Sequence, residues 1–416
     1  MCSCVTMATI ARATTFSLPR LCTASDCQTV SSLEWPPLEA IFHWIPFAGC
    51  LFWLGKAGRG RHTQALSLLE CFMFRRPDWL ASLFNRAPYV AKPAARHHGP
   101  AGYRNLYPFT LPSLGSLLHW KLAQWWRARP DHRPEMVPVT GGDPAALRAN
   151  CLRSSVTWLG HASSFVQLAG QNVLIDPVLS SRASPFRHLG PKRQVPLPID
   201  LADLPRIDLV LLTHLHYDHL DFPTLKRLAQ QSGGAPDFVV PLGVARAVRA
   251  AGVPAERLVE LDWWHAVQRG ALRVLLTPAH HWSNRGPWGD LNKALWGGYL
   301  LEGAGLKIWY PGDTGYQAEL FHEIGLHIGP VDFALLPIGA YEPRKVMRAQ
   351  HVNPDEAVRI FKHVAARKAW AVHWGTFILT DEPIQQPMAE LAMALREQEV
   401  SPADFMLPAI GETIWL

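Results

Sequence analysis

The stretch THLHYDHLDF, residues 213–222, places three histidines and two aspartates within ten positions. It follows IDLVLL (207–212), an apolar run that predicts a strand covered on both faces. Ionisable groups at the end of a buried strand are costly unless a partner offsets their desolvation. Residues two apart in an extended segment point to the same side, and the next ones follow at a turn. One short loop can therefore present four ligands to one point: His214, His216, Asp218 and His219.

Other imidazoles and carboxylates also come directly after apolar strands. His280 and His281 follow LRVLLTPA, Asp313 follows GLKIWYPG, and His373 follows KAWAV. If these strands pair in one sheet with 207–212, their C-terminal ends bring the polar groups to one edge, where open α/β sheets place ligands. His280 and His281 compete for one place, and we expect His281 to take it.

These candidate ligands are nitrogen and oxygen donors without a thiolate, a set that suits zinc and also iron or manganese. They are too many for one tetrahedral ion, so we expect two ions that share a carboxylate, with Asp313 as the bridge. Asp313 as a plain turn residue and His373 as a core histidine stay open as alternatives. Asp176 in LIDP is predicted to fix an imidazole tautomer. His161 in GHAS is either such a partner or an ordinary loop histidine.

Short β-rich runs alternate with helical patterns after about residue 90, which predicts an α/β sandwich with two layers of strands. SVTWLG, SFVQLAG and NVLIDP indicate an antiparallel meander with a turn at residues 170–171. The segment 353–366 starts a helix, because Asn353 can cap it and Pro354 suits its first position.

Composition and charge indicate a globular protein and argue against nucleic-acid binding. The 416 residues are 48% hydrophobic and 18% charged, which is an ordinary globular balance. A net charge of +6 suits an anionic substrate or membrane surface, and no Lys/Arg block of the kind that binds nucleic acid is present. After residue 71 only Cys151 remains, so the main body cannot form a disulfide framework of its own. We expect a cytoplasmic protein.

A peripheral contact with the membrane is predicted for residues 113–130. Apolar side chains recur there at helical spacing, at Leu114, Leu117, Leu118, Leu122 and Trp125. Such a helix can lie in a lipid interface. Packing of this face on the body of the protein or across a homodimer is the alternative.

The chain resembles the N-acylphosphatidylethanolamine-hydrolysing phospholipase D group of the metallo-β-lactamase superfamily. The resemblance covers about residues 87–416 and is carried by VTWLGHASSFVQLAG, LIDPVLSSRASPF, GPKR, HYDHLD, PAHHWSNR, ALWGGY, PGDTGY, PIGAYEPR, QHVNPDEAVRI and HWGTF. It implies a four-layered αββα sandwich of the metallo-β-lactamase type. It also implies a ligand set: His214, His216 and His281 on one zinc ion, Asp218, His219 and His373 on a second, and Asp313 between them.

The activity that the resemblance implies is a zinc-dependent phosphodiesterase of the phospholipase D type. It would hydrolyse N-acylphosphatidylethanolamine-like phospholipids to N-acylethanolamine and phosphatidic acid. Asp218 and Asp313 would hold the metals and the attacking hydroxide in register. Gln350 and His351 would line the site, and His351 would steady the phosphate or protonate the leaving group, unless it is a loop histidine without substrate contact.

Two other functions fit the same ligands. One is hydrolysis of a lactone or another ester by the same pair of metals. The other is a di-iron redox protein, although such relatives tend to carry a carboxylate in the second position of the first motif, where this chain has His216.

Residues 1–86 have no counterpart in the resemblance and differ in composition from the rest. We expect them to be a poorly defined N-terminal extension that is not native, with Met73 as a candidate start. Residues 87–416 are then the hydrolase domain.

Overall fold

The computed structural model describes residues 96–126, 130–286 and 290–416, without the side chains of Leu114, Lys121 and Trp125. The predicted N-terminal extension, residues 1–86, and the candidate start Met73 lie outside the described residues. Within them, no helix combines the length and the hydrophobicity that a bilayer crossing requires.

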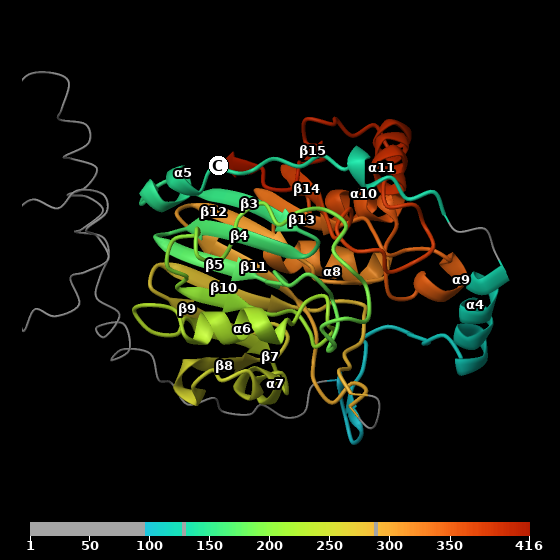
Figure 1. Ribbon diagram of the computed structural model, residues 1–416, viewed down its shortest axis with the longest axis horizontal. Coiled ribbons are helices and arrows are strands. Elements are labelled where there is room, and N and C mark those ends of the chain that lie inside the picture. The colour runs from blue at the N-terminus through green and yellow to red at the C-terminus, as the bar shows by residue number, and fades with distance from the viewer. Residues whose placement is uncertain (1–95, 127–129, 287–289) are drawn as a thin grey trace, which may run out of the picture. The chain divides into compact units, whose positions relative to one another are not determined.

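Two mixed sheets of seven strands form the centre of the fold (Figure 1). The first sheet has the order β16-β3-β4-β5-β6-β7-β8 and the second β15-β14-β13-β12-β11-β10-β9. The first sheet comprises β16 (Thr413–Trp415), β3 (Ser155–Gly160), β4 (Ser163–Leu168), β5 (Gln171–Ile175), β6 (Leu209–Leu211), β7 (Asp237–Pro241) and β8 (Leu258–Leu261). The second comprises β15 (Phe405–Met406), β14 (Lys368–Val372), β13 (Phe333–Pro337), β12 (Leu306–Tyr310), β11 (Gly298–Gly303), β10 (Leu272–Thr277) and β9 (Ala266–Arg269).

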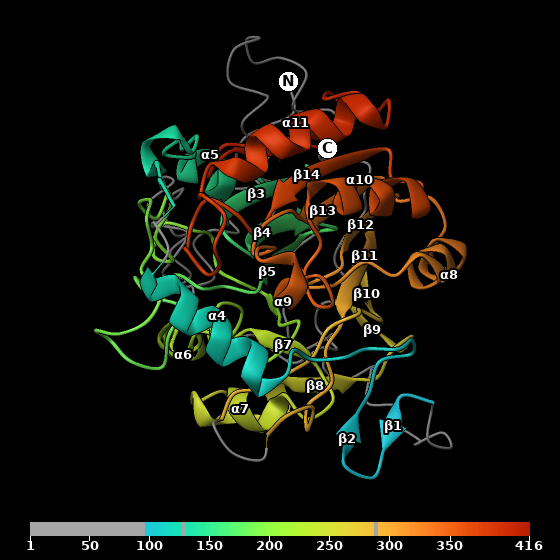
Figure 2. The same ribbon diagram turned by 90° about the vertical axis from the view of Figure 1, so that its right-hand side faces the viewer.

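Helices cover the outer face of each sheet (Figures 1 and 2). On the first sheet they are α5 (Pro144–Ala149), α6 (Phe222–Ala229) and α7 (Ala245–Ala250), and on the second α8 (Ala318–Ile328), α10 (Pro354–His363) and α11 (Gln386–Glu397). The predicted four-layered αββα sandwich is therefore confirmed. The other elements are β1 (His98–Gly99), β2 (Gly102–Tyr103), α4 (Leu114–Trp126), η4 (Pro134–Met136), η5 (Ala255–Arg257) and α9 (Arg344–Met347).

Strand β6 is buried on both faces, as its apolar sequence predicts. Leu209 and Leu211 belong to the core between the sheets. Val210 and Leu212 point the other way, into the core under α6 and α7. This alternation is the ordinary result of the two-residue repeat of a strand. The loop that follows β6 thus starts from a rigid, fully covered position.

Local sequence signals explain several boundaries. Strands β3, β4 and β5 form the predicted antiparallel meander, and Gly170 in its turn has a φ of 74° that favours glycine. Helix α10 begins with a capping box, in which Asn353 and Glu356 each accept a hydrogen bond from the other's backbone. The predicted meander and the predicted helix start are confirmed, but the turn between β4 and β5 lies at residues 169–170, one position earlier than predicted.

Helix α4 is only partly packed against the rest of the protein. Leu117 and Trp120 contact Val346 and Met347 of α9. On the remaining surface of the helix, Leu118 is 62% and Trp126 87% exposed. The apolar stripe predicted for residues 113–130 is therefore divided between the body of the protein and solvent, while Leu114 and Trp125 lie outside the described side chains.

Candidate metal centre

The polar residues singled out in the sequence meet where strand ends of both sheets converge. The 213–222 loop follows β6 in the first sheet, whereas His281, Asp313 and His373 follow β10, β12 and β14 in the second. The assumption that these strands pair in one sheet is thus wrong, because the chain closes two separate sheets over a shared core. The ends of the strands nevertheless reach one place, since the sheets face each other.

Three imidazoles form a first donor group: His214, His216 and His281. Their nitrogens face one another, with 2.8 Å from His214 Nε2 to His216 Nδ1 and 3.3 Å from His281 Nε2 to the same His216 atom. His214 and His281 are fully buried and His216 lies at the edge.

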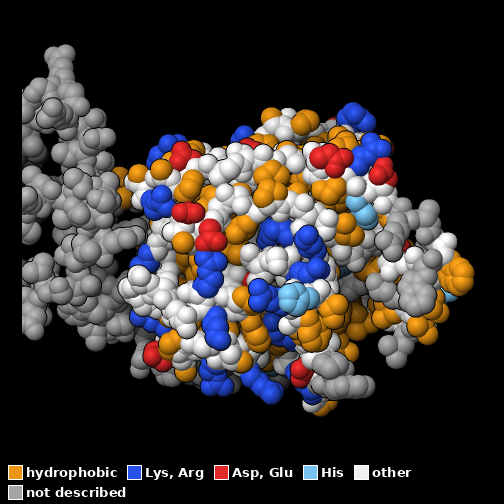
Figure 3. All heavy atoms as spheres, in the orientation of Figure 1, with side chains coloured by type: hydrophobic (Ala, Val, Ile, Leu, Met, Phe, Trp, Pro, Cys, Tyr) orange, Lys and Arg blue, Asp and Glu red, His pale blue; other side chains and the backbone are white. Residues whose placement is uncertain are grey.

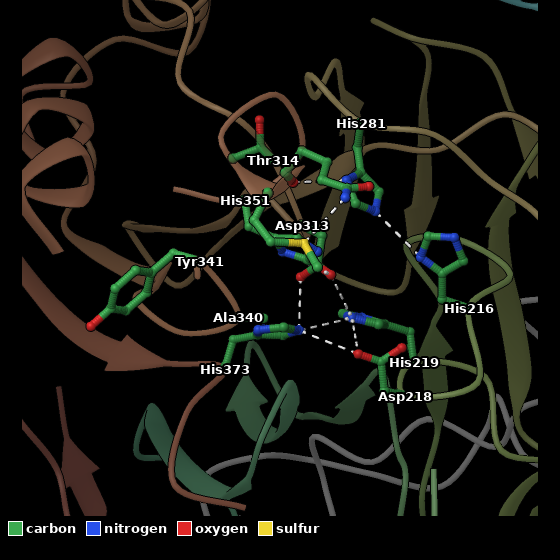
Figure 4. A network of polar contacts seen from close by, with 12 residues as sticks. His216, Asp218, His219, His281, Asp313, Thr314, Ala340, Tyr341, His351 and His373 are labelled. Atoms are coloured by element: carbon green, nitrogen blue, oxygen red, sulfur yellow. Dashed lines mark hydrogen bonds and ion pairs between the residues drawn. The ribbon is translucent and has the colours of Figure 1, made fainter. Parts of the chain in front are cut away.

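The second donor group consists of Asp218, His219 and His373. Nε2 of His219 lies 3.2 Å from Nε2 of His373, and these atoms lie 3.6 and 3.5 Å from Asp218 Oδ2. Figure 4 shows Asp313 in the middle, with His216 and His281 on one side and the second donor group on the other. Its carboxylate oxygens lie 3.1 Å from His219 Nε2 and 3.0 Å from His373 Nε2. Asp313 also lies within 4.8 Å of donor atoms of His214 and His281, so it stands between the groups.

Hydrogen bonds on the far side of three rings fix which nitrogen carries the proton. Thr213 Oγ1 donates to Asp176 Oδ2 over 2.6 Å, so it is left to accept from His214 Nδ1, at 2.9 Å. His219 Nδ1 donates to Asp176 over 2.8 Å, and His281 Nδ1 donates to the carbonyl oxygen of Gln350 over 2.9 Å. In each neutral ring the Nε2 atom therefore keeps a lone pair.

The Nε2 atoms of these three rings lie among further imidazole nitrogens and carboxylate oxygens, a set of electron-pair donors that a shared positive ion satisfies. Nitrogen and carboxylate donors held by buried outer hydrogen bonds are the usual protein environment of zinc. The residues present fit a pair of divalent cations, and the chemistry of the donors does not select between zinc, iron and manganese.

Electrostatics favours positive charge at the same place. Burial disfavours the charged form of His373, yet the carboxylates of Asp313 and Asp218 outweigh it and raise its pKa to about 9. The pKa of His219 is raised well above its ordinary value against the same burial penalty, with Asp313 the strongest opposing charge. In the first donor group burial prevails and lowers the pKa of His216 to about 4, which keeps this ring neutral.

His161 belongs to the site more closely than its sequence context indicates. Its Nε2 lies 3.0 Å from Asp218 Oδ2, and its ring lies 4.0 Å from that of His373, centre to centre. Its carbonyl oxygen accepts from the backbone N–H of His373 over 2.9 Å. His161 and His373 both have positive φ, at 52° and 62°, a backbone strain that is common at functional sites.

The structure separates the neighbouring residues His280 and His281. His281 reaches the first donor group, whereas His280 packs edge-on against Phe109 and is 5% exposed. Burial lowers the pKa of His280 to about 4. Adjacent residues at the end of a strand point to opposite sides, which is why only one of them faces the centre.

Gln350 and His351 both lie beside the centre but in different ways. The side chain of Gln350 accepts from Trp282 Nε1 over 2.5 Å, and only its main-chain oxygen contacts a proposed ligand, His281. Nδ1 of His351 lies 3.7 Å from Asp313 Oδ2, and burial lowers the pKa of this imidazole to about 4. His351 therefore faces the centre as a neutral ring.

A further group of two histidines and one aspartate, His97, His98 and Asp262, is held together by hydrogen bonds and needs no metal ion. Nε2 of His97 and Nε2 of His98 lie 2.6 and 2.8 Å from the two carboxylate oxygens of Asp262. Every contact here joins an N–H donor to an oxygen acceptor, so hydrogen bonding satisfies the group without an ion. It ties the segment before β2 to the body. Asn105, which follows β2, accepts from the His281 backbone N–H over 3.1 Å and donates to the His281 carbonyl oxygen over 2.7 Å.

Comparison with known proteins agrees with this geometry. Residues 171–374 match the family model described as "Beta-lactamase superfamily domain". The chain is 39% identical over 301 residues to an uncharacterized protein of Mycobacterium tuberculosis, covering 72% of this chain and 77% of the relative. It is 39% identical over 268 residues to N-acyl-phosphatidylethanolamine-hydrolyzing phospholipase D 1 of Caenorhabditis elegans, covering 62% and 74%. The mitochondrial enzyme of the same description from Saccharomyces cerevisiae is 35% identical over 243 residues, covering 57% and 51%.

Proposed function

This chain belongs to the metallo-β-lactamase superfamily as a metal-dependent hydrolase, and we propose that it is a zinc-dependent phosphodiesterase of the phospholipase D type. Its substrates are N-acylphosphatidylethanolamine-like phospholipids, and the products are N-acylethanolamine and phosphatidic acid. The observation that carries the proposal is the pair of donor groups bracketing Asp313, in a chain that is 39% identical to a phospholipase D covered over 74% of its length.

In the proposed centre, His214, His216 and His281 hold one cation and Asp218, His219 and His373 hold another, with Asp313 between them. A bound pair of divalent cations would supply hydroxide at neutral pH and charge to neutralise phosphate oxygens. The chain contributes the geometry. His161 orients Asp218 through its 3.0 Å contact, and Asp176 keeps the Nε2 lone pair of His219 directed inward.

We propose that His351 hydrogen bonds to the phosphate group of the substrate. Its ring lies 5.3 and 5.7 Å from those of His281 and His373, centre to centre, and its Nδ1 lies 3.7 Å from Asp313 Oδ2. A neutral imidazole in this position can donate one N–H to a phosphoryl oxygen as negative charge develops there. The buried side chain of Gln350 does not contact the substrate in this proposal. It holds Trp282, by a hydrogen bond, beside the ring of the proposed ligand His216.

Access to a lipid is supported by exposed apolar surface next to positive charge. Helix α4 presents Leu118, Leu122 and Trp126 to solvent. The loop before β6 exposes Phe186 and Leu189, which are 63% and 66% accessible. Figure 3 shows Lys and Arg side chains gathered near the middle of one face, with hydrophobic side chains around them. Apolar groups bordered by cations suit the interface of an anionic membrane.

The test is product analysis with the purified, zinc-loaded protein on vesicles that contain N-acylphosphatidylethanolamine. We expect N-acylethanolamine and phosphatidic acid to appear together, and to be absent after chelation or in Asp313→Asn. The His351→Ala variant should keep its zinc content and lose about 10- to 100-fold in rate, because one stabilising hydrogen bond is removed.

Assays of the purified protein on lactones and simple esters, together with metal analysis, separate the phospholipase proposal from the two alternative functions. Lactone or simple-ester hydrolysis without lipid cleavage would replace the phospholipase assignment by the ester-hydrolase alternative. A purified protein that holds iron with a visible absorption band and has no hydrolytic activity would favour the di-iron redox protein.

A further inference from the structure

Arg285 contacts the loop that carries four of the proposed ligands, at residues that lie between these ligands or directly after them. Its Nη1 donates to the carbonyl oxygen of Leu215 over 3.0 Å and to that of Leu220 over 2.8 Å. Leu215 separates His214 from His216, and Leu220 directly follows His219. One guanidinium nitrogen therefore joins the two ends of the ligand run.

The face of the same guanidinium packs against aromatic rings of the loop. Its central carbon lies 4.3 Å from the ring centre of Tyr217 and 4.2 Å from that of Phe222. Stacking of a planar cation on aromatic faces fixes orientation as well as distance, which an ammonium group cannot do equally. All four of these guanidinium contacts with the loop involve residues that are not proposed ligands: Leu215, Tyr217, Leu220 and Phe222.

The segment that carries Arg285 is attached to the loop in return. Tyr217 Oη donates to the carbonyl oxygen of Arg285 over 2.6 Å. Ser283 Oγ accepts from the backbone N–H of Leu215 over 3.3 Å. Because His281 begins this segment, the attachment couples the ligands after β6 to the ligand after β10, and hence one sheet to the other.

We propose that Arg285 is a positioning residue that holds the 213–222 loop, and its spacing to His281, in the conformation that binds metal. The first donor group draws its members from both segments, so its nitrogens converge only if the two are held in register. Metal affinity depends steeply on such outer contacts, commonly by 10- to 100-fold for one residue. The inference rests on the proposed metal-binding role of these residues and not on the identity of the substrate.

The test compares Arg285→Met and Arg285→Lys with an exposed control on α7, Arg246→Met. Methionine keeps an apolar stem and removes the donors, while lysine keeps the charge without the planar group. Two quantities are measured for each protein: the apparent zinc dissociation constant, by competition with a chromophoric chelator, and the melting temperature of the metal-free and zinc-loaded forms. We expect zinc binding to weaken about 10-fold or more in Arg285→Met, by less in Arg285→Lys, and not in Arg246→Met.

Melting temperatures distinguish positioning from ordinary packing. If Arg285 positions the ligands, the rise in melting temperature on adding zinc becomes smaller in Arg285→Met. Unchanged zinc affinity together with a parallel fall in both melting temperatures would overturn the inference. Should Arg285→Met not fold, the same two outcomes are read from Arg285→Lys. Tight zinc binding by a wild-type protein that cleaves no phospholipid would sink the proposed function and leave the role of Arg285 intact.

Discussion

Asp176 illustrates how one carboxylate sets the protonation of two proposed ligands. It is fully buried, and accepts from the backbone N–H and the hydroxyl of Thr213 as well as from His219 Nδ1. Because the Thr213 hydroxyl donates its proton to Asp176, its oxygen can only accept from His214 Nδ1. In both rings Nε2 is thereby the nitrogen that faces the centre, and imidazole binds a metal through this atom once the atom has released its proton.

Replacing Asp176 by asparagine should weaken zinc binding about 10-fold or more without removing any proposed ligand. The amide lacks the charge that holds the His219 Nδ1 proton, and it brings a donor N–H₂ to a place where Thr213 also donates. Zinc content after dialysis against a buffered zinc solution measures the effect.

The control for this variant is Asp203→Asn, because the Asp203 side chain is 57% exposed and its carboxylate lies 3.9 Å from Arg148 and not against a proposed ligand. Equal zinc content in Asp176→Asn and in wild type would show that the hydrogen bonds of Asp176 serve folding alone.

At the scale of elements, helix α4 packs some of its apolar residues against the body of the protein and exposes others to solvent. Trp120 packs beside Val346 and Met347, and its Nε1 donates to Asp381 over 2.7 Å, which holds the helix to the body. Leu118, Leu122 and Trp126 stay in solvent. Exposed leucine and tryptophan on an anchored helix would release free energy on entering a lipid interface.

The double variant Leu118→Gln with Trp126→Gln should bind anionic vesicles at least 10-fold more weakly, because full burial of each removed side chain is worth roughly 1.5–3 kcal/mol and 10-fold needs only about 1.4 kcal/mol in total. Its rate on the soluble diester bis-p-nitrophenyl phosphate should stay at the wild-type value. Vesicle sedimentation and a spectrophotometric assay give the two readouts.

Leu326→Gln serves as the matched control, because Leu326 on α8 is likewise exposed, at 72%. If all three proteins sediment equally with vesicles, α4 is not the lipid contact.

For the whole molecule, the proposed centre joins the two sheets. Two members of each donor group follow β6 in the first sheet, whereas His281, Asp313 and His373 follow strands of the second. Buried carboxylates and inward lone pairs carry a desolvation cost that bound cations offset. Metal binding should therefore stabilise the packing of the sheets and not only the loops.

Chelation should lower the melting temperature by roughly 5–11 °C, and zinc should restore it. A ligand at 100 times its dissociation constant stabilises the folded state by about 2.7 kcal/mol, and in domains of 150–250 residues 1 kcal/mol shifts the melting temperature by roughly 2–4 °C. Differential scanning calorimetry with and without a chelator measures this. Identical melting curves would mean that no cation stabilises the folded chain.

Several of these features were predictable because they depend on short stretches of sequence. The spacing of His214, His216, Asp218 and His219 places all four on one loop after a strand whose apolar run is itself local. The capping box of α10 and the meander of β3 to β5 likewise depend on residues that are close together in the sequence. The resemblance added the αββα layering, which periodicity alone does not specify.

The sequence by itself determined which residue types stand at the strand ends, and therefore the chemistry that the chain can offer. Only the tertiary structure decided which of them meet: His281 and not its neighbour His280, ends from two sheets and not one, and His161 against Asp218. It also assigned the contacts of Arg285, and made the backbone oxygen of Gln350 the partner of a proposed ligand. The reason is physical: these contacts join segments tens to hundreds of residues apart, and their geometry is set by how two sheets pack over a common core, which no local pattern encodes.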